Sequence, residues 1–336
     1  MSTLRTSRSA RLLLSVTALA VLVVAAGAGR ASADTPASRL LATYQPVMRF
    51  DPQERFLPTS VQSFIADAAL ERLTQTGWVV ADSAPEPGDL PGPGTGVWRL
   101  NEQPCSPTLP LGGLDCYAAA WSEVHGAPVV YGRVVHQGDS TVLQYWYFYY
   151  DDVYSYLYPP ADFLWQAHEG DWEVVNVVLS ADDEPDFVGY SEHCTGTTWA
   201  WDAIKPVGGT HPVVYVAAGS HSNWLTPGTH PIPEGCIPKP VFGVLQQLLL
   251  PLPQDVATGA GESAGPPGTG GAVSPIDKID DDHPNWVSFP GFWGELQYFH
   301  APAPVGTVAL GTSPVGPAYH AIWADPLGTM ATWSVG

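Results

Sequence analysis

The chain has 336 residues, with 13 Lys and Arg against 33 Asp and Glu, and a formal net charge of −20. This acidic excess argues against nucleic acid or an anionic membrane as a nonspecific electrostatic partner, and it favours solubility and cation binding. The 34 Gly, 34 Pro, 13 Trp and 14 Tyr are typical of an all-β protein with many turns. The chain is too aromatic to be disordered.

The N-terminus has the pattern of a secretory signal peptide. Three arginines precede an apolar run (residues 12–29), and small residues at 31–33 form a cleavage site. We therefore expect residues 1–33 to be removed and the mature protein, residues 34–336, to be secreted as a single domain. Four of the 13 basic residues leave with the signal, so the mature net charge is 9 − 33 = −24.

The elements of the mature chain are mostly short strands. The first element is a helix over residues 60–73, capped by Thr59 or Ser60, with apolar residues on one face. Runs rich in β-branched and aromatic residues, each bounded by Gly, Pro, Asp or Ser, predict strands at 128–136, 140–150, 171–180 and 211–220. Gly/Pro-rich stretches predict flexible loops at 84–96 and 257–275. This pattern predicts a β-sandwich, jelly-roll-like, with long loops and a few short helices.

The apolar stretch at 241–253 is the best candidate for a membrane span in the mature chain. It is too short, and Gln246, Gln247 and Pro251 interrupt it. We expect it to form a buried helical turn or to cover a sheet edge, and we expect no transmembrane segment.

Four cysteines in an exported chain predict two disulfides. Three pairings are possible, and we favour Cys105–Cys116 with Cys194–Cys236 because each closes a loop between neighbouring strand candidates. No cysteine or histidine spacing indicates a thiolate zinc site.

The segment QAHEGDWEVVNVVLS (166–180) carries four titratable residues between positions 168 and 173 and then becomes apolar. Alternate residues of a strand share a face. Asp171 and Glu173 therefore point to the same side as Val175, and Trp172 points to the other. Two carboxylates thus lie at the beginning of a strand face that is otherwise apolar.

Ionised carboxylates in such a place need a basic residue, a proton or a metal ion. No Lys or Arg occurs from Val134 to Ile204, although this span holds 13 Asp and Glu. Protonation neutralises one acid of a close pair, but not a cluster. A divalent cation is the simplest answer; oxygen ligands with one or two histidines favour Ca²⁺ or Mg²⁺, and Mn²⁺ or Zn²⁺ also suit the set. The alternative is a solvated strand end beside a turn.

Two further strand ends offer ligands. Asp151 and Asp152 end the strand at 140–150, and His221 with Asn223 follows the strand at 211–220. We expect these ends to meet the 168–173 segment at one rim, with Gly170 allowing a sharp turn. His221 on its own is equally an ordinary hydrogen-bonding side chain.

The segments HEGDWEVV, YWYFYYDD and GSHSNW together resemble the vacuolar protein sorting-associated protein 62 family. Residues 49–64 look like the N-terminal block of that family, and residues 289–295 and 313–317 look like its C-terminal block. The function of the family is largely undefined, so the resemblance informs the fold more than the activity.

A more distant resemblance is to the necrosis- and ethylene-inducing-peptide-like proteins, secreted β-sandwich cytolysins with the heptapeptide GHRHDWE. Aligned with AHEGDWE (167–173), it implies His168, Asp171 and Glu173 as metal ligands. An upstream aspartate completes the set, best matched by Asp151, or by Asp152 if the turn differs. Glu169 and Gly170 replace the Arg and second His of the motif. The metal of those cytolysins helps to dock a sphingolipid sugar headgroup, so the resemblance implies a glycan or lipid headgroup as partner.

Three functions remain open from the sequence. The first is a secreted metal-binding β-sandwich that recognises a glycan or lipid headgroup through its metal rim, with Asp151, His168, Asp171 and Glu173 as ligands and Asp152 and His221 as further candidates. The second is a metal-dependent hydrolase with a metal-activated water and Glu169 or His221 as general base. The third is a structural exported protein with a stabilising ion. The sequence does not decide whether the protein is an enzyme, nor its oligomeric state.

Overall fold

The computed structural model describes residues 35–102, 108–109, 119–122, 126–155, 165–237, 239, 243, 246, 249, 251–281, 284–295, 297–301 and 306–336. These residues form several β-sheets with a few short helices, which confirms the predicted all-β class. Residues 1–33, the pair Cys105–Cys116 and most of 241–253 lie outside the described residues, so the predictions for them stay predictions. None of the helices described is long and apolar enough to cross a membrane.

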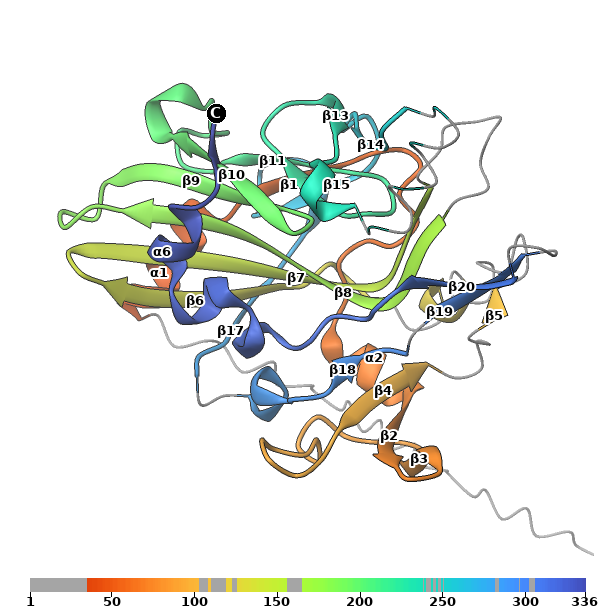
Figure 1. Ribbon diagram of the computed structural model, residues 1–336. Helices are drawn as coiled ribbons and strands as arrows, with labels where there is room; N and C mark the ends of the chain where they lie inside the picture. Colours follow the sequence, from red (N-terminus) through yellow and green to blue (C-terminus); the bar gives the residue numbers. More distant parts are fainter. Residues whose placement is uncertain are drawn as a thin grey trace, which may run out of the picture. The chain divides into compact units, whose positions relative to one another are not determined.

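A seven-stranded sheet is the centre of the described structure (Figure 1). Its strands, in spatial order, are β17 (Ile276–Lys278), β6 (Val130–Gln137), β7 (Ser140–Ser155), β8 (Trp165–Leu179), β9 (Pro185–Glu192), β10 (Thr195–Ala200) and β21 (Ser334–Val335). From β6 to β10 the neighbours are antiparallel, and the edge strands β17 and β21 pair in parallel. The strand β7 continues beyond the predicted 140–150 to residue 155, and β8 begins before the predicted 171–180, at residue 165. These extensions carry Asp151, Asp152, His168 and Glu169.

A second sheet packs on one face of the central sheet and makes the sandwich. Its strands, in spatial order, are β12 (Asn223–Trp224), β11 (Val213–Val216), β1 (Val47–Phe50), β15 (Ser263–Gly265) and β16 (Ala272–Val273). Tyr147 and Val175 of the central sheet share a buried cluster with Met48 and Val214 of the second. The stretch 257–275 is thus not all loop, because β15 pairs with β1 and β16 pairs with β15.

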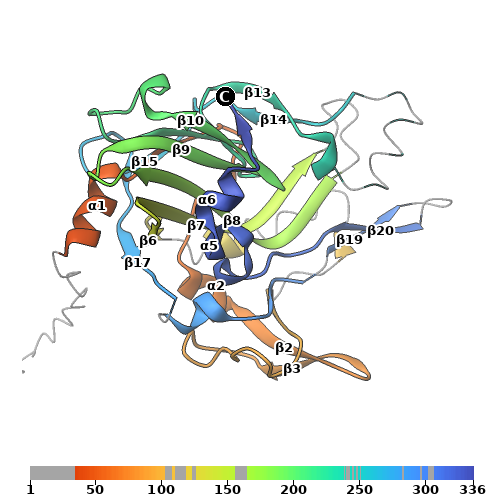
Figure 2. The same cartoon turned by 60° about the vertical axis from the view of Figure 1, so that its left-hand side comes forward.

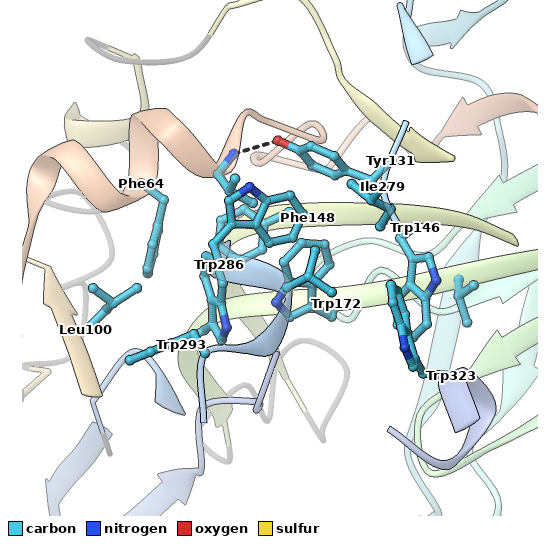
Figure 3. Packing of buried hydrophobic residues seen from close by; sticks show 14 of the residues in the cluster. Phe64, Leu100, Tyr131, Trp146, Phe148, Trp172, Ile279, Trp286, Trp293 and Trp323 are labelled. Carbon is cyan, nitrogen blue, oxygen red and sulfur yellow. Dashed lines mark hydrogen bonds between the residues drawn. The ribbon is translucent and has the colours of Figure 1, made fainter. Parts of the chain in front are cut away.

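Tryptophans fill the other face of the central sheet (Figure 3). Trp172 stacks on Trp286 with ring centroids 5.7 Å apart and meets Trp293 edge-on at 5.3 Å. Over this cluster lie the short helices α2 (Val61–Asp67), η3 (Asn285–Ser288), η4 (Pro317–Tyr319), α5 (Ala321–Ala324) and α6 (Pro326–Met330). The alternation predicted for β8 is confirmed, since Trp172 and Val175 lie in different clusters.

A four-stranded sheet lies beside α2, with the hairpin β2–β3 at the lower edge of Figure 2. Its strands, in spatial order, are β18 (Phe292–Trp293), β4 (Trp98–Glu102), β2 (Ala68–Thr74) and β3 (Gly77–Asp82). The predicted helix at 60–73 is wrong beyond residue 67. Ser60 caps α2 as predicted, but residues 68–74 form β2 because β4 and β3 offer hydrogen-bond partners on both sides.

The remaining elements are peripheral. They are α1 (Pro36–Tyr44), η1 (Trp201–Ala203), η2 (Glu234–Cys236), the pair β13 (Gly228–Pro231) with β14 (Gln254–Ala257), and the three-stranded sheet β20 (Gly306–Gly311), β19 (Gln297–Ala301) and β5 (Thr108–Leu109).

The predicted disulfide between Cys194 and Cys236 is present and ties the β9–β10 turn to η2. Replacing both cysteines by Ser is expected to lower the free energy of unfolding by about 3–4 kcal/mol, because a cross-link over this separation restricts the unfolded chain. Urea unfolding of the double variant, with the reduced wild type as control, measures this. An unchanged midpoint would contradict it.

Candidate metal centre

Asp152, His168 and Asp171 each bring one ligand atom to within 4.8 Å of the others. Asp152 and His168 are paired across the β7–β8 ladder, with Oδ2 and Nε2 3.5 Å apart. All three residues are buried, although their side chains keep a small exposed fraction of 6–12%. We call these three residues the metal centre.

Gly170 explains why His168 and Asp171 face the same side. Residues three apart on a regular strand point to opposite faces. Gly170 has a left-handed φ of +61°, which shifts the alternation of β8 by one residue. A Cβ at Gly170 would lie 2.2 Å from the backbone oxygen of Trp293, so this position accepts no side chain.

His221 supports the centre from the β11–β12 connection. Its ring stacks on Tyr149 at 3.8 Å, its Nδ1 lies 3.0 Å from Asp171 Oδ2, and its Nε2 lies 3.4 Å from Glu54 Oε1. The residue is fully buried and has a left-handed φ of +53°, an unusual backbone for a residue other than Gly. His221 therefore orients the Asp171 carboxylate.

Glu173 lies one step further along β8. The Ser191 hydroxyl donates to Glu173 Oε2, and Asn223 Nδ2 donates to the same oxygen over 3.3 Å. Three segments of the chain therefore meet here, at Asp152, residues 168–173 and residues 221–223. The sequence predicts this convergence, but Asp152 and residues 168–173 lie inside β7 and β8 and not at strand ends.

Asp151 and Glu169 are paired directly across the ladder and so share a face. Glu169 Oε2 accepts the backbone N–H groups of Glu102 (3.1 Å) and Glu295 (3.0 Å), which places this pair on the side of β4 and β18. The sequence analysis favoured Asp151 as the upstream ligand, with Asp152 as the alternative. In the structure it is Asp152 that lies in the metal centre.

Glu54 is the functional residue that the sequence pattern missed. Its side chain is fully buried, it contacts His221, and it accepts the Gly219 N–H over 2.7 Å. Glu54 lies in the loop after β1, where it has no strand alternation to mark it. Only the scarcity of basic residues in the mature chain hinted that buried acids would gather.

The pKa values of the centre reflect burial and mutual repulsion. Burial, reinforced by Asp171, raises the pKa of Asp152 and of Glu173 well above the usual range. Burial lowers the pKa of His168. Burial also acts to lower the pKa of His221, but Glu54 and Asp171 together raise it well above its ordinary value. Without a cation, this many buried acids are costly to ionise.

Several buried oxygens around the centre lack a hydrogen bond. They are Asp152 Oδ1, Asn223 Oδ1 and the Tyr149 hydroxyl. An unpaired buried oxygen costs about 1–3 kcal/mol, and a coordinated cation removes this cost for a ligand. Two aspartates and a histidine with unsatisfied oxygens nearby are a donor set that fits a divalent cation.

Glu192, at the end of β9, gives the stability a pH dependence of its own. Burial raises its pKa to about 7, against the lowering effect of the Thr197 hydroxyl, which donates over 2.6 Å. The folded state therefore favours the protonated form of Glu192. The contribution of Glu192 to the free energy of unfolding is full below about pH 4.5 and is lost as the pH rises towards 7.

The variant Glu192→Gln removes this dependence. Relative to wild type, its free energy of unfolding is expected to increase by roughly 2 kcal/mol between pH 4.5 and pH 8. Urea unfolding at several pH values measures the difference, with the exposed Glu184→Gln as the control for loss of charge. A difference that does not change with pH would contradict the expectation.

No family model matches the chain, and no curated protein matches it, so the resemblance to the vacuolar protein sorting-associated protein 62 family gains no support from these comparisons. Among solved structures, Necrosis and Ethylene inducing Protein 2 from the causal agent of cocoa's Witches Broom disease is 17% identical, with 57% of this chain and 68% of that chain covered and a TM-score of 0.30. NLPPya in complex with mannosamine is 12% identical, with 57% and 69% covered and a TM-score of 0.30. A structure described as a toxin fold for microbial attack and plant defense is 12% identical, with 71% and 72% covered and a TM-score of 0.31. These TM-scores are too low to support a conclusion about this chain.

Proposed function

We propose that this protein is secreted and binds one divalent cation through Asp152, His168 and Asp171, with Glu173 close by. The observation that carries the proposal is the convergence of three ligand atoms within 4.8 Å at a place where Asp152 Oδ1 has no hydrogen bond. No Lys or Arg occurs between residues 134 and 204 to neutralise these acids. A bound cation supplies the missing positive charge.

The donor set favours Ca²⁺ or Mg²⁺, with Mn²⁺ or Zn²⁺ as the alternatives. Carboxylate oxygens suit the hard cations, and one imidazole is compatible with all four. Asp152 and His168 would hold the ion from the β7–β8 ladder, and Asp171 would be oriented by His221.

For the ligand of the loaded centre we propose a glycan or a lipid headgroup. The motif AHEGDWE supports this through its resemblance to the sugar-docking cytolysins. The side chains of Asp171 and His168 are also partly exposed, at 12% and 9%, so the centre is not sealed from solvent. The excess of acidic residues makes nucleic acid an unsuitable partner.

Metal analysis of protein purified without chelator tests the first proposal. We expect about one ion per chain, and a melting temperature that falls with chelator and recovers with the matching cation. Absence of a stoichiometric ion, together with a melting temperature that none of the four cations changes, would refute cation binding.

Glycan-array and liposome binding, with and without chelator, tests the ligand. If the protein binds neither glycans nor liposomes in either condition, headgroup recognition is refuted and cation binding is not affected.

A further inference from the structure

A second group of buried polar side chains lies beside the metal centre. His193 Nε2 and Asp255 Oδ2 are 2.9 Å apart, and the Ser220 hydroxyl donates to Asp255 Oδ1 over 2.7 Å. Burial acts to raise the pKa of Asp255, but His193 and Ser220 lower it, so Asp255 stays ionised. Ser220 precedes His221, so one short segment connects this group to the metal centre.

The backbone holds His193 in a strained position. His193 and Cys194 form the two-residue connection between β9 and β10, since Glu192 pairs with Thr195. His193 has a φ of +52°, which favours Gly, Asn or Asp at the first central position of such a turn. The disulfide at Cys194 fixes the turn. Left-handed residues other than Gly are concentrated at functional sites.

His193 also has what a general base needs. Its Nε2 is held by a buried carboxylate, its Nδ1 makes no hydrogen bond with any described residue, and 10% of its side chain is exposed. His221, by contrast, is fully buried with both ring nitrogens close to carboxylates. A base oriented by a third group is the arrangement found in enzymes that activate water or a hydroxyl.

We propose that His193, oriented by Asp255, is a general base that activates water for the hydrolysis of neutral carboxylic esters. Nδ1 takes a proton from water, and the water oxygen bonds to the ester carbonyl carbon. The bond from that carbon to the alkoxy oxygen then breaks, and the alkoxide receives the proton from His193. The products are the carboxylic acid and the alcohol, and no further reactant is needed.

The charge of the surroundings selects the substrate class. Asp255 on β14, Asp171 on β8 and Glu192 on β9 all act on His193, while Tyr154 of β7 contributes a ring at 5.7 Å. Asp255 and Asp171 repel an anionic substrate such as a phosphodiester, and Glu192 does so above its pKa of about 7. A neutral ester is not repelled. Burial acts to lower the pKa of His193, but Asp255 raises it above the ordinary value. The hydrolysis should therefore increase with pH up to a pKa above that of free histidine.

The test compares p-nitrophenyl acetate with bis(p-nitrophenyl) phosphate, with and without chelator. The variant His193→Asn removes the imidazole and keeps a polar side chain that tolerates the left-handed backbone. We expect it to lower kcat/KM for the acetate by about 100-fold or more, whereas His136→Asn, at an exposed histidine, changes nothing. Asp255→Asn should move the pH profile to lower pH. Equal rates in wild type and His193→Asn, or a preference for the phosphate, would overturn the proposal.

Chemical modification of the wild-type protein gives a readout that does not depend on activity. Diethyl pyrocarbonate should modify His193 before the fully buried His221, and loss of esterase activity should follow modification of His193. A His193 that resists the reagent would also overturn the proposal. Since the step needs no cation, either result leaves the metal centre untouched.

Discussion

Asp171→Asn and Asp152→Asn are each expected to abolish the stabilisation of this protein by divalent cations. A cation present at about 100 times its dissociation constant adds about 3 kcal/mol to the free energy of unfolding, which corresponds to roughly 5 °C in melting temperature for a chain of this size. Either substitution removes a charged ligand from the metal centre. Thermal unfolding with chelator and with added Ca²⁺ or Mg²⁺ measures the cation-dependent increment for each variant.

The matched control is Asp151→Asn. Asp151 is the neighbour of Asp152 and is equally buried, but its ladder partner is Glu169, on the other face of the sheet. This variant is expected to keep the cation-dependent increment, whatever its own stability. Loss of the increment in Asp151→Asn and its retention in Asp152→Asn would show that the upstream ligand is Asp151, as the sequence first suggested.

Gly170→Ala is expected to destabilise the fold by about 3–5 kcal/mol. The left-handed backbone at φ +61° costs any residue with a Cβ about 1–2 kcal/mol, and the new methyl group would press on the backbone oxygen of Trp293 at 2.2 Å. A backbone oxygen cannot move aside as a flexible side chain can. Urea unfolding measures the loss, and cation binding should weaken as well because His168 and Asp171 are displaced from each other.

Gly138→Ala separates the two costs. Gly138 has nearly the same φ, +62°, but a Cβ there meets nothing within 4 Å. This variant should lose only about 1 kcal/mol, the cost of the backbone alone. Similar losses at both positions would mean that the contact with Trp293 contributes nothing.

The local chemistry of the centre could be predicted from the sequence because it depends on few variables. Strand alternation placed Asp171 and Val175 on one face and Trp172 on the other, and the structure agrees. The absence of Lys and Arg between residues 134 and 204 led to the proposal of a cation beside these acids. The pairing of Cys194 with Cys236 followed from the positions of the expected strands.

Other features depend on contacts that a linear pattern does not contain. The helix expected at 60–73 ends early because residues 68–74 find strand partners far along the chain. The choice between Asp151 and Asp152 depends on the ladder register and on the left-handed turn at Gly170. Glu54 and Asp255 reach the site from loops and strands whose sequences carry no motif.

The segment 219–223 holds both layers of the sandwich at one end. Gly219 binds Glu54, Ser220 binds Asp255, His221 binds Asp171, and Asn223 binds Glu173. The segment connects β11 to β12 of the five-stranded sheet, whereas Asp171 and Glu173 belong to β8 of the seven-stranded sheet. All three residues of the metal centre belong to β7 and β8, so an ion there would connect the two layers only through the contact of Asp171 with His221. Its loss would weaken that contact while the tryptophan face stayed packed.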